Sequence, residues 1–388
     1  MGAPLTLAKP PHVALIGGGF IGPVHAEALR RIGVPVTGVL ELNLELGRAT
    51  AARLGATKVF SSIEELLADP EIGAVHIASP NPAHYEQALK ALKAGKHVLC
   101  EKPLAVTSAE TGELAKEAEA RPTQAAAVNY NIRFYPVCHE MRARVARGDI
   151  GKVLSVTGSY TQDWLLQPTD YNWRVEPDGA TNLRAIADIG THWMDLAQFV
   201  SGLKIEKVLS DLATFHPVRQ KPVGGSETFT GSAAAQRKTE PVNIVTDDYG
   251  AVLLRFDGGA RGVYHATQCQ AGRKNRLELE VSGTEGSLVW DSQDPDVLWI
   301  GRRGRNNELL QRDPGIMSPE AAEISHYPGG HAEGFPDAFK QLALSMYSWI
   351  GKGGKTPPPF PTFADGHYEV KICEAIARSS KEGTWASV

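Results

Sequence analysis

The chain has 388 residues, of which 42% are hydrophobic and 22% charged, and its formal net charge is −4 at pH 7. This composition is typical of a globular protein, and the length exceeds what one hydrophobic core usually organises, so we expect two domains. The mildly acidic balance argues against a nucleic-acid partner, and no apolar stretch reaches the length of a membrane span.

The four cysteines lie far apart and show no CxxC spacing. They are Cys100, Cys138, Cys269 and Cys373. This distribution is typical of reduced core thiols and not of a disulfide framework or a zinc site. We therefore expect a cytoplasmic protein without a metal site.

A glycine-rich turn follows the first predicted strand, residues 12–16. The sequence Gly17-Gly18-Gly19-Phe20-Ile21-Gly22 leads directly into Pro23, which suits the first turn of a helix. This strand–turn–helix context is the one that a GxGxxG motif requires. Gly17 permits a tight turn and Gly19 a close approach of the backbone to a pyrophosphate, so the turn predicts a dinucleotide site.

Glu41 strengthens this prediction. It ends a second strand, residues 34–40, and lies 19 residues after Gly22, where a dinucleotide fold places its ribose-binding acid. The five residues after it carry no cation, and Arg48 is the nearest one in the sequence. Because the 2′-phosphate of NADP would face this carboxylate uncompensated, we predict NAD as the cofactor.

Strand and helix patterns alternate up to about residue 130. Helices are expected over 44–54, 63–67, 83–94 and from 103 to about 118, and strands over 58–60, 74–78, 97–100 and 125–130. In this pattern Asn81 is the expected N-cap of the fourth helix and Gly95 its stop. The repeat predicts a doubly wound parallel sheet, an α/β Rossmann domain over residues 1–131.

Lys102 follows the strand at residues 97–100 directly, in the sequence Glu101-Lys102-Pro103. In open parallel sheets ligands bind at the carboxyl ends of the strands. Pro103 restricts the backbone of Lys102 to extended or turn geometry. We therefore expect Lys102 at the ligand edge of the sheet.

Strand patterns dominate the second part of the chain, after a helix at residues 134–147. Strands are expected over 153–161, 205–214, 242–256, 260–269, 276–282 and 286–290, and helices over 187–201, 332–350 and 364–380. Turn signals such as Asp257-Gly258-Gly259 favour antiparallel hairpins. Residues 132–388 are therefore predicted to form an α+β domain with a large open, mainly antiparallel sheet, and residues 216–241 a mobile loop.

The helix at residues 187–201 carries Asp188, His192 and Asp195 on a face separate from its apolar stripe. A histidine one turn from an aspartate can be oriented by it and can accept a proton near neutral pH. The pattern also fits a solvated polar stripe. A metal site is a third alternative, but no second histidine has suitable spacing.

Two aromatic segments precede this helix, Gln162-Asp163-Trp164 and Tyr171-Asn172-Trp173-Arg174. Rings interleaved with hydrogen-bonding groups suit a polyhydroxylated ligand, and they equally suit ordinary core aromatics at a domain boundary.

The chain resembles the Gfo/Idh/MocA family, the glucose–fructose oxidoreductase and inositol dehydrogenase group. The matching points are residues 17–22 with His25, residues 79–82 with His84, residues 101–103, the turn at 148–151, and Asp188 with His192. The resemblance implies that Lys102 and His192 meet at the nicotinamide with Asp188 beside them. It also implies a cis Lys102–Pro103 bond and a homodimer or homotetramer formed through the second sheet.

The expected activity is an NAD-dependent dehydrogenase that oxidises a secondary hydroxyl of a sugar, sugar derivative or cyclitol. The expected cofactor residues are Gly17, Gly19, Phe20, Ile21, Glu41, Ser79, Asn81, His84, Glu101 and Lys102, and the expected substrate residues are Gln162, Asp163, Trp164, Trp173, Arg174, Asp188 and His192. Two alternatives are a glycosidase that retains NAD and oxidises its sugar transiently, and a non-catalytic sensor of the same fold.

Overall fold

The computed structural model describes residues 9–177, 181–223 and 238–388. Contacts divide the chain into two compact units. The first contains residues up to Phe134 together with Gly334–Val370, and the second contains Tyr135–Glu333 and Lys371–Val388. The sequence-based division assigned everything after residue 131 to the second domain, whereas the contacts group helix α9 (Phe335–Gly351) with the first unit.

The first unit is built on a six-stranded sheet in the order β3-β2-β1-β4-β5-β6, in which every neighbouring pair is parallel. Its strands are β1 (His12–Ile16), β2 (Val36–Leu40), β3 (Lys58–Phe60), β4 (Ile72–Ile77), β5 (His97–Cys100) and β6 (Ala126–Val128). This order reverses between β1 and β4 and is that of a doubly wound dinucleotide fold, as predicted.

Three of the helices that alternate with these strands begin at a side-chain cap. The five alternating helices are α1 (Ile21–Arg31), α2 (Leu44–Leu54), α3 (Ile63–Ala68), α4 (His84–Lys93) and α5 (Ser108–Glu119). Asn43 caps α2, Ser62 caps α3, and Thr107 with Glu110 forms a capping box at α5. The expected N-cap role of Asn81 is wrong, because Asn81 opens a short 3-10 turn (Asn81–Ala83) before α4.

Apolar side chains of the sheet form a core on each of its faces. One core joins Val75, Val98 and Val128 to the α4 residues Ala88 and Leu92. A core on the other face includes Val13 and Leu29 together with Ala343 and Tyr347 of α9. The contribution of α9 explains why this helix belongs to the first unit.

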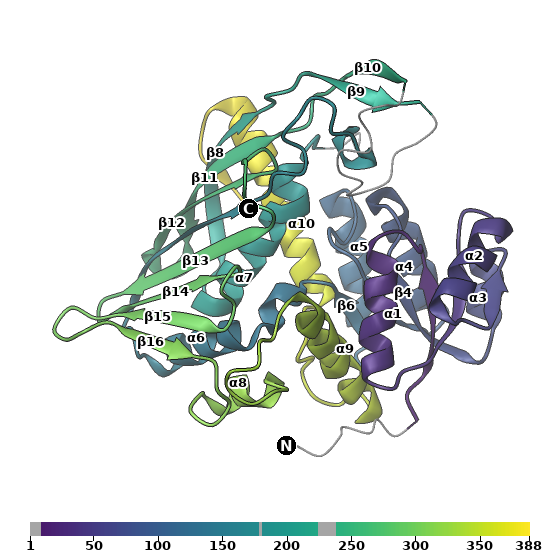
Figure 1. The fold of residues 1–388 in the computed structure, drawn as a ribbon, viewed down its shortest axis with the longest axis horizontal. Coiled ribbons are helices and arrows are strands. Elements are labelled where there is room, and N and C mark those ends of the chain that lie inside the picture. Colours follow the sequence, from purple (N-terminus) through teal and green to yellow (C-terminus); the bar gives the residue numbers. More distant parts are fainter. Residues whose placement is uncertain (1–8, 178–180, 224–237) are drawn as a thin grey trace. The chain divides into compact units, whose positions relative to one another are not determined.

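The second unit is built on a nine-stranded sheet in the order β16-β15-β14-β13-β7-β12-β11-β8-β17 (Figure 1). Its strands are β7 (Val153–Thr161), β8 (Ile205–Ala213), β11 (Tyr249–Phe256), β12 (Arg261–Thr267), β13 (Arg276–Gly283), β14 (Ser287–Asp291), β15 (Val297–Gly301), β16 (Glu308–Gln311) and β17 (Ala386–Ser387). All pairs are antiparallel except β7 with β12. The predicted mainly antiparallel sheet is confirmed.

The segment at residues 216–241 differs from the predicted mobile loop. Strands β9 (Val218–Pro222) and β10 (Thr239–Asn243) pair there as an antiparallel ribbon. Residues 224–237 lie outside the described part of the chain, so the prediction is wrong for the ribbon and untested for its connection. The strand expected over 242–256 is split, because Ile244–Asp248 separates β10 from β11.

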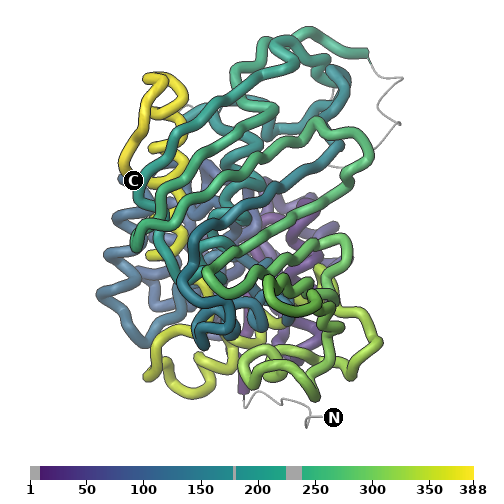
Figure 2. Tube along the Cα trace, turned by 90° about the vertical axis from the view of Figure 1, so that its left-hand side faces the viewer, coloured from purple at the N-terminus to yellow at the C-terminus, as the bar shows by residue number. Residues whose placement is uncertain are grey.

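Helices cover one face of the nine-stranded sheet. They are α6 (Pro136–Arg147), α7 (Thr191–Ser201) and the C-terminal part of α10 (Phe363–Glu382), and α8 (Pro319–Ile324) packs against α6. Trp193 of α7 stacks on Tyr264 of β12, with ring centroids 4.5 Å apart. On the other face, which Figure 2 shows toward the viewer, Leu253 and Val263 pair across β11 and β12 and are 45% and 42% exposed. None of the helices in the described residues has the length and apolar character needed to cross a membrane.

Candidate cofactor and substrate sites

The glycine-rich turn leaves room for a ligand where β1 passes into α1. A Cβ at Gly17, whose φ is +90°, would lie 2.8 Å from the carbonyl oxygen of Ala78, and one at Gly22 would lie 2.5 Å from the carbonyl oxygen of Gly17. A Cβ at Gly19 would meet nothing within 4 Å, and the neighbouring Phe20 is 56% exposed. The turn is thus packed tightly beneath and open above, which fits a bound pyrophosphate.

Glu41 is held against this turn at the end of β2. Its Oε1 accepts a hydrogen bond from the Gly18 N–H at 2.6 Å and another from the Thr50 hydroxyl at 3.0 Å. These two bonds use one carboxylate oxygen, and the geometry suits a ribose diol at the other. Arg53 of α2 donates to the carbonyl of Gly18, so a cation lies at this turn that sequence spacing did not indicate.

His84 connects the loops that follow β4 and β5. Its ring nitrogens lie 2.8 Å from the Ser79 carbonyl oxygen and 2.9 Å from the Pro103 carbonyl oxygen. Ser79 also donates its hydroxyl to Gln87 at 2.6 Å. Both loops are at the carboxyl edge of the parallel sheet, so His84 fixes part of the predicted ligand edge.

Glu101, Lys102 and Pro103 leave β5 at this same edge. The Lys102–Pro103 peptide bond is cis, which confirms the expectation. The Glu101 carboxylate is buried and accepts hydrogen bonds from His25 Nε2 at 3.0 Å and from the Asn129 amide. Its pKa is lowered to about 2, because His25, Lys102 and Asn129 outweigh the burial that would raise it.

The second unit holds the other two predicted catalytic residues. Asp188 lies in a single π-helical turn (Ile186–Gly190), and His192 in the first turn of α7. Asp188 accepts hydrogen bonds from Arg174 Nε at 3.3 Å and from Gln268 Nε2 at 2.8 Å. His192 and Asp195 are 8% and 2% exposed, which excludes the alternative of a solvated polar stripe.

A chain of amide groups extends from Asp188 toward the first aromatic segment. Gln268 donates to Gln162 Oε1 at 3.2 Å, and Gln162 donates to Asn275 Oδ1 at 2.8 Å. Trp164 donates its indole N–H to the same Gln162 oxygen at 2.7 Å. The structure therefore brings Gln162 and Asp188 together through Gln268.

The remaining predicted substrate residues are oriented differently. Asp163 forms a salt bridge with Lys274 at 2.7 Å and accepts from the Gly272 N–H at 3.2 Å. Trp173 is 37% exposed and carries the Arg174 guanidinium over its ring, 4.5 Å from the centroid. Asp163 is thus tied to the loop after β12, whereas Trp173 remains available to a ligand.

Gln268, Asn275 and Arg184 are the polar partners that sequence reasoning missed. Arg184 donates to Gln268 Oε1 at 3.2 Å, opposite the amide that reaches Asp188. None of the three belongs to a motif. Only the pairing of β7 with β12 and β13 brings the ends of these strands next to Gln162.

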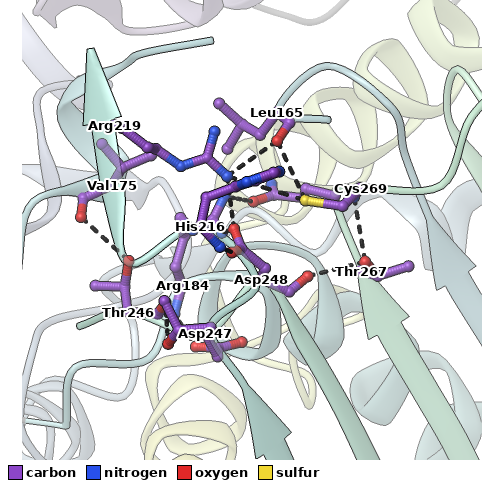
Figure 3. Close-up of polar contacts among 12 residues, drawn as sticks. Leu165, Val175, Arg184, His216, Arg219, Thr246, Asp247, Asp248, Thr267 and Cys269 are labelled. Atoms are coloured by element: carbon purple, nitrogen blue, oxygen red, sulfur yellow. Dashed lines mark hydrogen bonds and ion pairs between the residues drawn. The ribbon is translucent and has the colours of Figure 1, made fainter. Parts of the chain in front are cut away.

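A buried charged cluster, shown in Figure 3, is joined to these amide groups through Arg184 and Gln268. Asp248 accepts from both Arg184 and Arg219, and Arg219 also donates to the Leu165 and Gln167 carbonyls. Its neighbour Asp247 accepts from the backbone N–H groups of Arg184 and of Ile186, where the π turn begins. Asp247 therefore holds the start of the turn that carries Asp188, and burial raises its pKa to about 6.

Within the described ranges, no group of three or more His, Cys, Asp or Glu side chains could hold a metal ion. The alternative of a metal at Asp188, His192 and Asp195 thus has no support from the geometry.

Two families of sequences match this chain. Residues 12–130 match the oxidoreductase family with an NAD-binding Rossmann fold, and residues 138–289 match the Gfo/Idh/MocA C-terminal domain. Levoglucosan dehydrogenase of Pseudarthrobacter phenanthrenivorans is 32% identical over 394 residues, which cover 97% of this chain and 98% of that protein. The 1,5-anhydro-D-fructose reductase of Ensifer adhaerens is 34% identical over 303 residues, which cover 77% and 82%.

The solved structures agree with the sequence matches. A levoglucosan dehydrogenase in complex with NADH and levoglucosan superposes with a TM-score of 0.86 at 29% identity, covering 98% of this chain and 99% of that one. Both the Rossmann unit with its open glycine turn and the unit with the large sheet are thus accounted for by one group of proteins. The chain belongs to the Gfo/Idh/MocA family of oxidoreductases, and its N-terminal unit is that family's NAD-binding Rossmann domain.

Proposed function

We propose that this protein is an NAD-dependent dehydrogenase that oxidises a secondary hydroxyl of a sugar, sugar derivative or cyclitol. The observation that carries the proposal is the pair Glu101–Lys102, which follows β5 at the carboxyl edge of a sheet whose first turn can accept a dinucleotide. The relatives named for levoglucosan and for 1,5-anhydro-D-fructose support an anhydro sugar as the first substrate to test.

The first unit is the proposed cofactor domain. The backbone of Gly17, Gly19, Phe20 and Ile21 would hold the pyrophosphate, and Glu41 would accept hydrogen bonds from the adenosine ribose. The loops after β4 and β5, with Ser79, Asn81, His84, Glu101 and Lys102, would surround the nicotinamide half. NAD bound there supplies the hydride acceptor for the oxidation.

The side chains of this protein would accept and transfer the proton of the substrate hydroxyl. His192 would accept the hydroxyl proton, since a histidine suits proton transfer near neutral pH. Lys102 would hydrogen-bond the developing alkoxide or join the proton relay. Asp188, which Arg174 and Gln268 hold in place, would orient His192 or bind a neighbouring hydroxyl.

The second unit is the proposed substrate domain. Gln162 and Arg174 present hydrogen-bonding groups next to Asp188, and Trp164 and Trp173 present ring faces that suit the C–H side of a sugar. Asp163 would act indirectly, by fixing the loop at Gly272 through its hydrogen bond.

We also propose that the protein is cytoplasmic and that it forms a homodimer or homotetramer. The uncovered face of the nine-stranded sheet supports a second copy as its partner, because it presents Leu253 and Val263 beside the stacked rings of Tyr249 and His265. Exposed apolar side chains that lie together on a sheet face are typical of a protein–protein interface. Light scattering should give a molar mass of at least twice the 41.8 kDa of one chain, and Val263→Glu should reduce that mass to the mass of a single chain.

The test of the activity uses the full chain with NAD⁺ and a panel of levoglucosan, 1,5-anhydro sugars, myo-inositol and free hexoses. NADH formation by absorbance is the expected result with at least one of them. Cleavage of a glycoside without net NADH would favour an NAD-retaining glycosidase. A third outcome would favour a non-catalytic sensor: the protein binds the dinucleotide tightly, turns over no member of the panel, and binds a protein ligand.

A further inference from the structure

Four buried polar side chains form a row inside the first unit. Tyr347 comes from α9, His76 from β4, His25 from α1, and Glu101 follows β5. Their exposures are 1%, 0%, 1% and 7%. The proposed reaction uses the last of them only as the neighbour of Lys102 and assigns no role to the other three.

The row is continuous. The Tyr347 hydroxyl lies 3.0 Å from His76 Nε2, His76 Nδ1 lies 3.1 Å from His25 Nδ1, and His25 Nε2 lies 3.0 Å from Glu101 Oε1. The rings also pack on one another and on Phe339, which meets His25 edge-on at 5.5 Å between centroids. The packing leaves the histidine rings little freedom to choose other partners.

When both histidines are neutral and Tyr347 is the donor to His76, one arrangement of protons satisfies every contact in this row. Burial raises the pKa of Tyr347, so its hydroxyl keeps its proton and donates it to His76 Nε2. A neutral histidine has one donor and one acceptor nitrogen, so His76 must carry its proton on Nδ1 and donate it to His25 Nδ1. By the same rule His25 carries its proton on Nε2 and donates it to the Glu101 carboxylate.

The titratable groups around Glu101 agree with this assignment. Burial holds the pKa of His76 well below its ordinary value, so His76 is neutral. Besides His25 and Lys102, the charge of Glu101 affects His84 of α4 and Cys100 of β5, and burial together with Glu101 raises the pKa of the Cys100 thiol. Asn129 donates its amide to Glu101 and adds no charge.

We propose that Tyr347, His76 and His25 form a directed hydrogen-bond chain that keeps the Glu101 carboxylate ionised and fixed beside Lys102, which makes His25 and His76 positioning residues for that lysine. The inference rests on the proposed role of Lys102. The link to the lysine is direct, because the Lys102 backbone N–H lies 3.3 Å from the other carboxylate oxygen, Glu101 Oε2. A carboxylate whose first oxygen is held by His25 and Asn129 cannot rotate away from this N–H without losing both bonds.

The first experiment determines the tautomers of the two histidines and requires no catalytic activity. ¹⁵N-histidine-labelled protein, with resonances assigned by substitution, reports the tautomer of each ring by NMR. We expect the Nε2–H tautomer at His25 and the Nδ1–H tautomer at His76, both neutral at neutral pH. An Nδ1–H tautomer at His25, or an imidazolium at either residue, would overturn the proposal even if the dehydrogenase assignment were correct.

Tyr347→Phe tests the direction of the chain. Loss of the terminal O–H removes the donor to His76 Nε2, so the Nε2 resonance of His76 should shift, while Nδ1 stays protonated because Glu101 still fixes the proton of His25. Tyr85→Phe is the control, since the Tyr85 hydroxyl donates to Glu113 at 2.6 Å on the exposed surface of this unit. An unchanged Nε2 resonance of His76 in Tyr347→Phe would contradict the chain.

His25 tests the link to Lys102. His25→Gln keeps an amide N–H near the position of Nε2, whereas His25→Leu keeps only volume. If Lys102 acts as a neutral amine, a loosened carboxylate stabilises its ammonium form less, and the rising limb of kcat against pH moves to lower pH by about one unit. We expect this shift in His25→Leu and a return toward the wild-type pH profile in His25→Gln. A rising limb at the same pH in wild type and in both variants would overturn the positioning role.

Should His25→Leu fail to fold, Tyr347→Phe carries the same measurement with a smaller shift expected. If no substrate is found at all, the proposed function fails, whereas the NMR experiment still tests the tautomer assignment. The two failures are therefore distinguishable.

Discussion

Both units bury a polar network next to a proposed catalytic residue, but the two networks are built differently. In the first unit Tyr347, His76 and His25 form a line of neutral donors and acceptors that ends at a single charge, Glu101. In the second unit a single carboxylate, Asp248, lies between the two buried guanidinium groups of Arg184 and Arg219. The network of the first unit orients a single charge, whereas the network of the second unit pairs several charges with one another.

The difference matters for stability. A linear chain of neutral groups loses one hydrogen bond when one member is removed, typically about 1 kcal/mol, plus the cost of any group left without a partner. A buried ion pair that loses one member leaves an uncompensated charge, which costs about 3–5 kcal/mol. The second unit should therefore be the more fragile of the two toward single substitutions.

The largest expected effect breaks the charged cluster. Asp248→Asn leaves Arg184 and Arg219 buried without a carboxylate, and it should lower the free energy of unfolding by about 3–5 kcal/mol in urea titrations. Glu176→Gln is the control, because Glu176 pairs with Lys221 at 2.8 Å on the surface and is 46% exposed, so about 1 kcal/mol or less is expected. Equal losses in the two variants would refute the distinction between the networks.

The two networks should also respond to acid in opposite directions. Glu101 has a folded pKa of about 2 against an ordinary value of 4.5, so its stabilisation is present above about pH 4.5 and is lost as the pH falls toward 2, about 3 kcal/mol in all. Asp247 has a folded pKa of about 6 against 3.8, so its contribution becomes more favourable as the pH falls from above 6 to 3.8. His76, neutral when folded, adds a loss that begins as the pH falls below 6.5.

Urea titrations between pH 7 and pH 3 check these signs. Relative to the unmodified protein, Glu101→Gln should lose less stability below pH 4.5, and Asp247→Asn should lose more between pH 6 and 4. Curves parallel to that of the unmodified protein would show that neither carboxylate has the assigned shift.

The third prediction concerns catalysis at the end of the neutral chain. Lys102→Ala should keep the fold and NAD binding and lose at least about a hundredfold in kcat, because a positioned proton-transfer group is removed. Kinetics with the substrate found in the panel, and NAD binding by fluorescence titration, measure the two effects separately. A variant with near-normal kcat and only a raised KM would remove Lys102 from the chemistry.

The first unit could be predicted from the sequence nearly completely because its signals are local. The glycine turn, Glu41 and the Glu101–Lys102–Pro103 segment each lie next to the strand that positions them. Helix α9 was assigned to the wrong unit, since nothing in its own sequence shows that Ala343 and Tyr347 pack against Val13 and Leu29. The same reason hid the row of buried polar side chains, in which the hydrogen-bonded neighbours His76 and Tyr347 are 271 residues apart.

The second unit was predicted in outline only. Its antiparallel sheet follows from the turn signals, but the position of Gln268 next to Gln162 depends on strand pairing between residues more than 100 positions apart. The ribbon β9–β10 was missed because its strands are polar and contain Pro222 and Pro241, which disfavour a strand assignment. Arg219, which this ribbon carries into the charged cluster, could not be recognised as buried from an isolated basic residue.

The smallest expected effect concerns cofactor choice at the glycine turn, where a few charges decide between NAD and NADP. Glu41 is held by Gly18 and Thr50, and its carboxylate would oppose a 2′-phosphate, so kcat/KM should favour NAD⁺ by at least about tenfold. From the sequence alone, we expect Glu41→Ala together with a basic residue at Leu42 to relax this preference. The structure sharpens that expectation, because Arg53 already donates to the Gly18 carbonyl and Leu42 is 94% exposed. Glu41→Ala alone should therefore bring kcat/KM for NAD⁺ and NADP⁺ close to equality. Adding Leu42→Arg should change the ratio of the two values little. Combining Glu41→Ala with Arg53→Met should remove the increase in kcat/KM for NADP⁺. Equal kcat/KM for NAD⁺ and NADP⁺ in the unmodified enzyme would show that Glu41 does not discriminate between them.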